Sequence, residues 1–123
     1  MADILIIDDD QALRSTMRRI LQRRGHVVRE AEDGSSGLAL LRESRPDLVV
    51  TDLYMPGKEG IETILELRAE DPELPILAVS GGGVTMTAGL SLGDAEALGA
   101  DASLAKPFSV EEFQDVVDRL LNG

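Results

Sequence analysis

Five polar residues of this sequence have the side chains needed for phosphate chemistry. Asp8 and Asp9 directly follow one apolar run, Asp52 and Ser80 each end another, and Lys106 follows a shorter one. Two carboxylates about 4 Å apart repel each other by roughly 4 kcal/mol at an effective dielectric of about 20, so an acidic cluster requires a proton or a cation. Oxygen ligands without cysteine favour Mg²⁺, with Mn²⁺ as the alternative, over zinc. A hydroxyl and an ammonium can then hold phosphate oxygens while a carboxylate acts as the nucleophile of a phosphoryl transfer.

This chemistry requires that the secondary-structure elements that carry these residues end close to one another. The apolar runs are short and bounded by turn residues, which is typical of buried strands. The expected strands are residues 4–7, 26–29, 47–52, 75–80 and 102–105. A short helix is expected at residues 94–98. Four longer helices are each indicated by apolar residues at helical spacing. In chain order these residues are Leu13, Met17, Ile20 and Leu21; Leu38 and Leu41; Ile61, Ile64 and Leu65; and Phe113, Val116, Val117, Leu120 and Leu121.

Strands that alternate with helices five times predict an α/β fold with a parallel sheet covered on both faces. Five such units in a small domain favour the flavodoxin-like, doubly wound (βα)5 arrangement with strand order 2-1-3-4-5. In that order the first, third and fourth strands are neighbours. Their carboxyl ends would bring Asp8, Asp9, Asp52 and Ser80 together, and the fifth strand would add Lys106 beside them.

Composition and charge narrow the class of protein. The 123 residues suffice for one domain with a hydrophobic core, and 43% of them are hydrophobic. The formal charge of −11, from 23 acidic and 12 basic residues, argues against direct nucleic-acid binding and allows a bound cation and a basic partner. Without cysteine there are no disulfides, thiolate metal sites or cysteine nucleophiles. No apolar run reaches the roughly 18 residues of a membrane span, and no secretory signal is evident, so we expect a cytoplasmic location.

Four short motifs stand at the ends of the expected strands. They are Ile-Asp-Asp at residues 7–9, Thr-Asp-Leu-Tyr-Met-Pro-Gly at residues 51–57, Ser80, and Ala-Lys-Pro-Phe at residues 105–108. In this order they resemble the receiver domain of bacterial two-component response regulators. The resemblance extends over essentially the whole chain. It implies one receiver domain at residues 1–123, without an output domain, which acts in a phosphorelay and catalyses only its own phosphorylation and dephosphorylation.

The resemblance also implies roles for single residues. Asp52 would be the phosphoacceptor, receiving its phosphoryl group from phosphohistidine. Asp8 and Asp9 would bind Mg²⁺ together with Asp52 and the backbone carbonyl of Tyr54. Lys106 would bind a phosphate oxygen.

The switch of a receiver domain is implied by the same resemblance, with two departures. The Ser80 hydroxyl would move toward the phosphate on activation, and the Lys106–Pro107 bond is expected to be cis. However, Ser103 stands where receivers usually carry an aromatic residue that reports phosphorylation. The glycine-rich stretch at residues 81–93 is also longer than is usual. We therefore expect the signal to leave the site through that stretch.

The implied partner is a sensor histidine kinase or a histidine phosphotransferase. Receivers resemble one another in binding this partner over the first helix. In this chain that helix carries a cluster of arginines within an otherwise acidic sequence: Arg14, Arg18, Arg19 and Arg23. We expect the partner to dock there. The downstream target is not implied by the sequence.

Three alternative functions would use parts of the same sequence pattern. An aspartate-nucleophile phosphatase of the haloacid dehalogenase type could use residues 8–10 as Asp-x-Asp, but it requires threonine where Ala12 stands and normally has a cap domain. A flavodoxin-like electron carrier would need aromatic walls for its flavin, and the chain has one Tyr, two Phe and no Trp. A degenerate receiver that binds partners without phosphorylation would not need all the acidic and lysine positions, which are present here.

Overall fold

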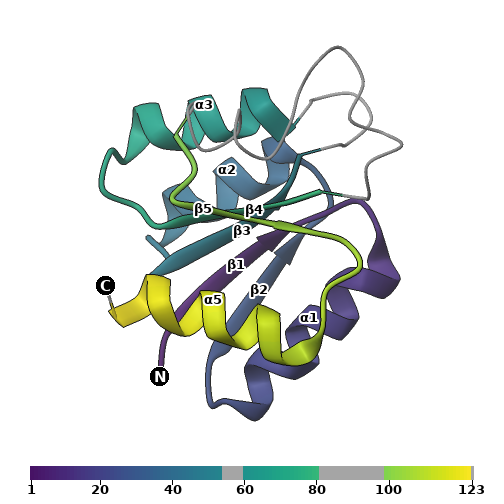
Figure 1. Cartoon of the computed structure of the whole chain (residues 1–123). Coiled ribbons are helices and arrows are strands. Elements are labelled where there is room, and N and C mark those ends of the chain that lie inside the picture. Colours follow the sequence, from purple (N-terminus) through teal and green to yellow (C-terminus); the bar gives the residue numbers. More distant parts are fainter. Residues whose placement is uncertain (54–59, 81–98, 123) are drawn as a thin grey trace.

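The strands form one parallel sheet. A computed structural model of the chain describes residues 1–53, 60–80 and 99–122, and in this part of the chain the strand order is β2-β1-β3-β4-β5. This order confirms the predicted flavodoxin-like topology (Figure 1). The strands are β1 (Asp3–Ile7), β2 (Val27–Ala31), β3 (Leu48–Asp52), β4 (Ile76–Ser80) and β5 (Ala102–Ala105).

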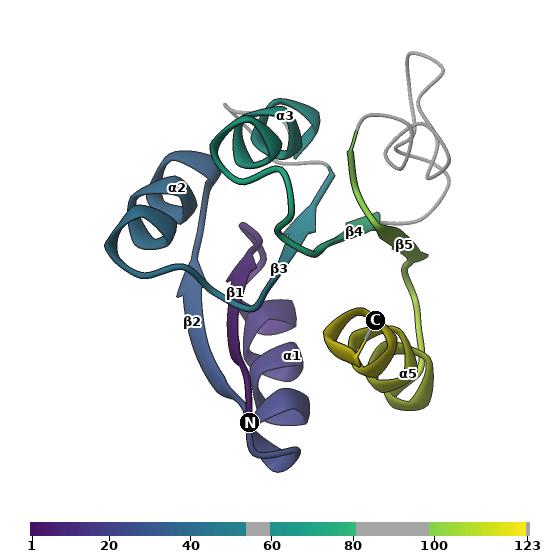
Figure 2. The ribbon, with the colours of Figure 1, turned by 90° about the vertical axis from the view of Figure 1, so that its left-hand side faces the viewer.

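The four described helices cover both faces of the sheet. They are α1 (Gln11–Arg23), α2 (Gly34–Glu43), α3 (Gly60–Glu70) and α5 (Val110–Asn122). Helices α2 and α3 lie on one face and α1 and α5 on the other, as two views at right angles show (Figures 1 and 2). The short helix predicted at residues 94–98 lies outside the described residues. None of the four helices combines the length and apolar composition that crossing a membrane requires.

Alternate residues of β1 supply the two halves of the core. Leu5 and Ile7 pack in the cluster under α2 and α3, whereas Ile4 and Ile6 pack in the cluster with α1 and α5, and all four are fully buried. Each buried aliphatic side chain of this size contributes about 1.5–3 kcal/mol. At Gly37 the helix α2 lies so close to the sheet that a Cβ would stand 2.4 Å from Ile7 Cδ1. Tight packing on both faces therefore holds the end of β1, which precedes the acidic pair, in a fixed position.

The register of the strands brings the predicted site residues to one edge. Ile7 of β1 pairs with Thr51 of β3, so that the residues after each of them lie at the same level. Asp52 pairs with Val79 of β4, directly before Ser80. Ser80 in turn pairs with Ala105 of β5, directly before Lys106. The carboxyl ends of four neighbouring strands thus converge, as the sequence predicts.

Hydrogen bonds and backbone conformation define the ends of α1 and the start of α5. The Asp10 side chain accepts a hydrogen bond from the Leu13 amide at 3.1 Å and caps α1. Gly25, just beyond α1, has a φ of 88°, which glycine adopts without strain. At the start of α5 the Ser109 hydroxyl accepts from the Glu112 amide at 3.0 Å, and Glu112 accepts from the Ser109 amide at 2.9 Å. These two reciprocal hydrogen bonds form a capping box.

One prediction for α3 is wrong. Leu65 is one of the apolar residues that predict the buried face of this helix, but the residue is 47% exposed. Ile64 and Leu67 are fully buried instead, together with Thr63. Because a buried threonine occupies part of the inner face, apolar spacing alone places the buried stripe of α3 incorrectly.

Candidate functional site

Three carboxylates meet at the carboxyl edge of the sheet. One oxygen each of Asp8, Asp9 and Asp52 lies within 4.8 Å of the other two. Asp8 is fully buried and Asp52 is 4% exposed, whereas Asp9 is exposed to solvent. The fold therefore brings together the three acids that the sequence predicts, with one of them open to a ligand from outside.

Lys106 is placed against two of these acids. Its Nζ lies 3.1 Å from Asp52 Oδ2 and 3.4 Å from Asp8 Oδ2. The backbone supports this position, because the Lys106 amide donates to the Ser80 carbonyl at 2.7 Å. The Lys106–Pro107 peptide bond is cis, as expected. The ammonium partly neutralises the acidic cluster and stands where it could contact a group bound to Asp52.

Burial changes the titration of Asp8. Its amide donates to the Ala31 carbonyl at 3.1 Å, and its Oδ1 accepts from the Asp10 amide at 2.9 Å. Loss of hydration on burial raises the pKa of Asp8 to about 6; the Asp10 hydrogen bond opposes this rise, Asp52 adds to it, and Lys106 opposes it. The cluster thus has an unfavourable excess of negative charge that a cation would relieve.

The donor set fits a hard divalent cation. The three acids offer only oxygen atoms, and no cysteine exists in the chain. Mg²⁺ is usually bound through one or two carboxylates, several waters and a phosphate oxygen. An acidic cluster with one open side and a neighbouring ammonium matches that requirement.

Other predicted site residues differ in how far the structure describes them. Ser80 is buried at the end of β4, beside the strand that carries Asp52. Ser103 is half-buried in β5, opposite Ala78. The carbonyl of Tyr54 and the glycine-rich stretch at residues 81–93 lie outside the described residues, so their roles stay predictions.

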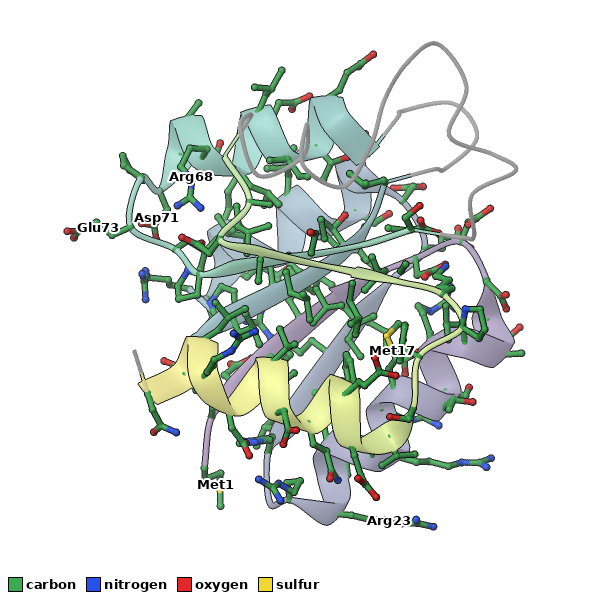
Figure 3. All side chains as sticks on the ribbon, viewed as in Figure 1. Met1, Met17, Arg23, Arg68, Asp71 and Glu73 are labelled. Carbon is green, nitrogen blue, oxygen red and sulfur yellow. The ribbon has the colours of Figure 1, made fainter. Side chains whose placement is uncertain are left out.

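The arginines of α1 divide into two groups. Arg14 and Arg18 both pair with Glu30 of β2, at 3.1 and 2.5 Å, and the Arg14 side chain is only 13% exposed. Arg19 and Arg23 are exposed, and Arg23 extends away from the end of α1 (Figure 3). Residue types alone predict one docking surface on this helix and do not reveal the contacts of Arg14. The spacing of Arg14 and Arg18, four residues apart on one helix face, is the signal that could have revealed a shared partner.

Comparison with known proteins supports one family. The family model of the response regulator receiver domain matches residues 4–118. Response regulator MprA from Mycobacterium sp. (strain KMS) is 41% identical over 112 residues, which are 89% of this chain and 46% of that protein. The chain thus spans about half the length of such curated relatives.

Solved structures show the same likeness. The receiver domain of NtrX from Brucella abortus superimposes with a TM-score of 0.89 at 33% identity, covering 98% of both chains. Chemotaxis protein CheY4 from Vibrio cholerae gives a TM-score of 0.87 at 30% identity, covering 98% of this chain and 99% of that one. With its sheet order and its acidic cluster, the chain belongs to the receiver domains of two-component response regulators.

Proposed function

We propose that Asp52 is the phosphoacceptor of this receiver domain and that it takes its phosphoryl group from phosphohistidine. The observation that carries the proposal is the position of its carboxylate, which ends the central strand, lies within 4.8 Å of two other acids and stands 3.1 Å from Lys106 Nζ. Family membership supports phosphorelay signalling and a cognate sensor histidine kinase as partner.

The transfer exchanges one bond for another. An oxygen of the Asp52 carboxylate attacks phosphorus, the phosphorus–nitrogen bond of phosphohistidine breaks, and the imidazole leaves with the electron pair. Lys106, already within hydrogen-bonding distance of Asp52, donates to an oxygen of the transferred group. Attack by water on the acyl phosphate later returns Asp52 to its carboxylate form and releases inorganic phosphate. Ser80, at the end of the next strand, is the hydroxyl proposed to bind a second phosphate oxygen.

Asp8, Asp9 and Asp52 would hold the cation, and the Tyr54 carbonyl is proposed as a further ligand. Mg²⁺ is the proposed ion, with Mn²⁺ as the alternative, because the carboxylates offer hard oxygen ligands. When bound, the ion supplies positive charge for the phosphate oxygens and so offsets their repulsion by the acids. Exposed Asp9 is the member of the set that incoming ligands reach first.

The proposal predicts the product of a simple reaction. Incubation of the wild-type protein with acetyl phosphate and Mg²⁺ should add one phosphoryl group per chain, seen as a higher intact mass. Peptide mapping should place the group on Asp52, and removal of the cation with EDTA should prevent the addition. An unchanged mass, with beryllofluoride also failing to bind, or a phosphoryl group on another residue would show that the proposal is wrong.

A second prediction concerns the docking of the phosphodonor. Arg19 and Arg23 are the exposed arginines of α1, so we propose that they form the cationic part of the docking surface. The double substitution Arg19→Glu and Arg23→Glu should slow transfer from a phosphorylated histidine phosphotransferase or kinase by about tenfold, because it reverses electrostatic steering. Phosphorylation by acetyl phosphate should keep its rate, since the small donor needs no protein contact.

The matched control for this experiment is Arg42→Glu with Arg45→Glu. These exposed arginines belong to and follow α2, on the opposite face of the sheet, and the substitutions change the net charge by the same amount. Because they also break ion pairs with Glu70 and Asp71, the control is measured with acetyl phosphate as well, where its rate should equal that of wild type. The control should retain most of the rate from the protein donor. Equal slowing by both pairs would mean that net charge, and not a surface on α1, determines docking.

A further inference from the structure

The turn between β1 and α1 is held by Arg14, one of the arginines of the predicted docking surface. Arg14 Nη1 donates to the backbone carbonyl of Asp8 at 2.5 Å, and its Nε donates to Glu30 Oε1 at 3.1 Å. One guanidinium therefore joins the end of β1 to the neighbouring edge strand β2. Arg18 also binds Glu30, at 2.5 Å, and so fixes the carboxylate that orients Arg14.

The other hydrogen bonds of this turn involve the amide and the carboxylate of Asp8, whereas Arg14 binds the Asp8 carbonyl. The Asp8 amide donates to the Ala31 carbonyl, and the Asp8 carboxylate accepts from the Asp10 amide. The Arg14 amide donates to the Asp10 carbonyl at 2.9 Å, which begins α1. The contact from Arg14 Nη1 thus holds the peptide group that links the two adjacent acids, Asp8 and Asp9.

We propose that Arg14 is a positioning residue for the metal site, acting through the backbone of the Asp8–Asp9 turn with Glu30 as its anchor. The inference rests on the proposed function, because it takes Asp8 and Asp9 as metal ligands. Arg14 itself contacts neither the cation nor the phosphoryl group in this proposal. Its guanidinium presents two separate N–H groups in a fixed fork, which a lysine ammonium cannot reproduce across the same two acceptors.

The experiment compares Mg²⁺ binding in the full chain without any phosphodonor. Titration calorimetry should give an affinity about tenfold weaker for Arg14→Lys than for wild type, as is usual when a group that orients metal ligands is lost. Because lysine retains the positive charge, a loss of Mg²⁺ affinity in this variant would be due to the missing fork geometry of the guanidinium. In phosphorylation by acetyl phosphate, Arg14→Lys should raise the Mg²⁺ concentration for half-maximal rate while the rate at saturating Mg²⁺ stays close to that of wild type.

Arg29→Lys is the matched control for a general loss of stability. Arg29 lies next to Glu30 on β2 and makes similar bonds, to Asp3 Oδ1 and to the carbonyls of Leu40 and Ser44, away from the acidic cluster. This variant should bind Mg²⁺ as wild type does. If Arg14→Lys proves too unstable to measure, Glu30→Gln, which removes the anchoring charge, should weaken Mg²⁺ binding in the same direction.

Three outcomes would overturn the inference, and they are distinguishable. Wild-type affinity in both Arg14→Lys and Glu30→Gln would show that the fork does not position the ligands. Equal weakening in Arg29→Lys would show that the effect is one of stability. Failure of the wild-type protein to bind Mg²⁺ would remove the metal site itself, and the proposed function with it.

Discussion

Asp8→Asn should make the metal-free protein more stable at pH 7 while it weakens Mg²⁺ binding. Asp8 is fully buried beside Asp52, and the loss of hydration raises its pKa to about 6 from 3.8. That difference corresponds to about 3 kcal/mol by which ionised Asp8 disfavours the folded state. Asparagine has no such charge and keeps an oxygen for the Asp10 amide. The raised pKa already includes the attraction between Lys106 and Asp8, so about 3 kcal/mol is the upper limit. With a weaker hydrogen bond from the Asp10 amide to the neutral side chain, the expected gain is about 1–3 kcal/mol.

The gain should depend on pH with a defined sign. Below about pH 4, Asp8 is protonated in both the folded and the unfolded chain, so wild type and variant should differ little. Between pH 4 and 6 the unfolded chain loses this proton while the folded protein retains it, so the stability of wild type relative to Asp8→Asn falls as the pH rises. Above about pH 6 Asp8 is ionised in both states, so the full cost of burying its charge is present. The stability difference between wild type and Asp8→Asn should then become constant.

Thermal unfolding with EDTA, measured from pH 4 to 8, checks this expectation. A chain of this size changes its melting temperature by roughly 4 °C for each kcal/mol. Asp9→Asn is the matched control, because exposed Asp9 carries no comparable burial cost and its loss should leave metal-free stability nearly unchanged. Addition of Mg²⁺ should stabilise wild type more than either variant. A melting temperature for Asp8→Asn equal to or below that of wild type at every pH would contradict the account.

The fold and the convergence of the acids could be predicted because they follow from local patterns. Each buried strand is a short apolar run, and in a parallel sheet the residues after such runs meet at one edge. Asp52 and Lys106 are far apart in sequence, but the register of β3, β4 and β5 brings them to 3.1 Å. Strand order alone was sufficient for that inference.

Contacts that depend on side-chain direction could not be predicted in this way. Arg14 and Arg19 look alike in a sequence, yet one is anchored by Glu30 and the other is exposed, because they lie on different sides of α1. Arg68 of α3 is a second example: its guanidinium donates to the carbonyls of Gly99 and Leu74, which joins the end of α3 to the segments before β4 and β5 (Figure 3). The spacing of Arg14 and Arg18 indicates a shared helix face but not the acid that lies opposite it, and the bonds of Arg68 have no signature in residue spacing. Both require the packed structure.

Lys106→Met should slow phosphorylation by acetyl phosphate about a hundredfold at saturating Mg²⁺, which is a typical result of removing a donor that stabilises developing negative charge. Methionine fills a similar volume but leaves the phosphoryl oxygens without the ammonium that lies beside Asp52 in the structure. Asp52→Asn sets the lower limit for the measurement, because it lacks the nucleophile and should give no phosphorylated product. Initial rates from intact mass would compare the three proteins.

Lys106→Met should lower the stability of the metal-free protein, whereas Asp8→Asn should raise it. Lys106 pairs with two buried acids, and removal of one partner from a buried ion pair leaves uncompensated charge that costs about 3–5 kcal/mol when the acids are ionised. The loss should be larger at pH 8 than at pH 5, because Asp8, whose pKa is raised to about 6, can take up a proton at the lower pH. Lys106→Arg, which keeps the charge, should recover part of the stability. Phosphorylation of Lys106→Met within twofold of wild type would show that the ammonium neutralises the acids of the resting protein and takes no part in the transfer.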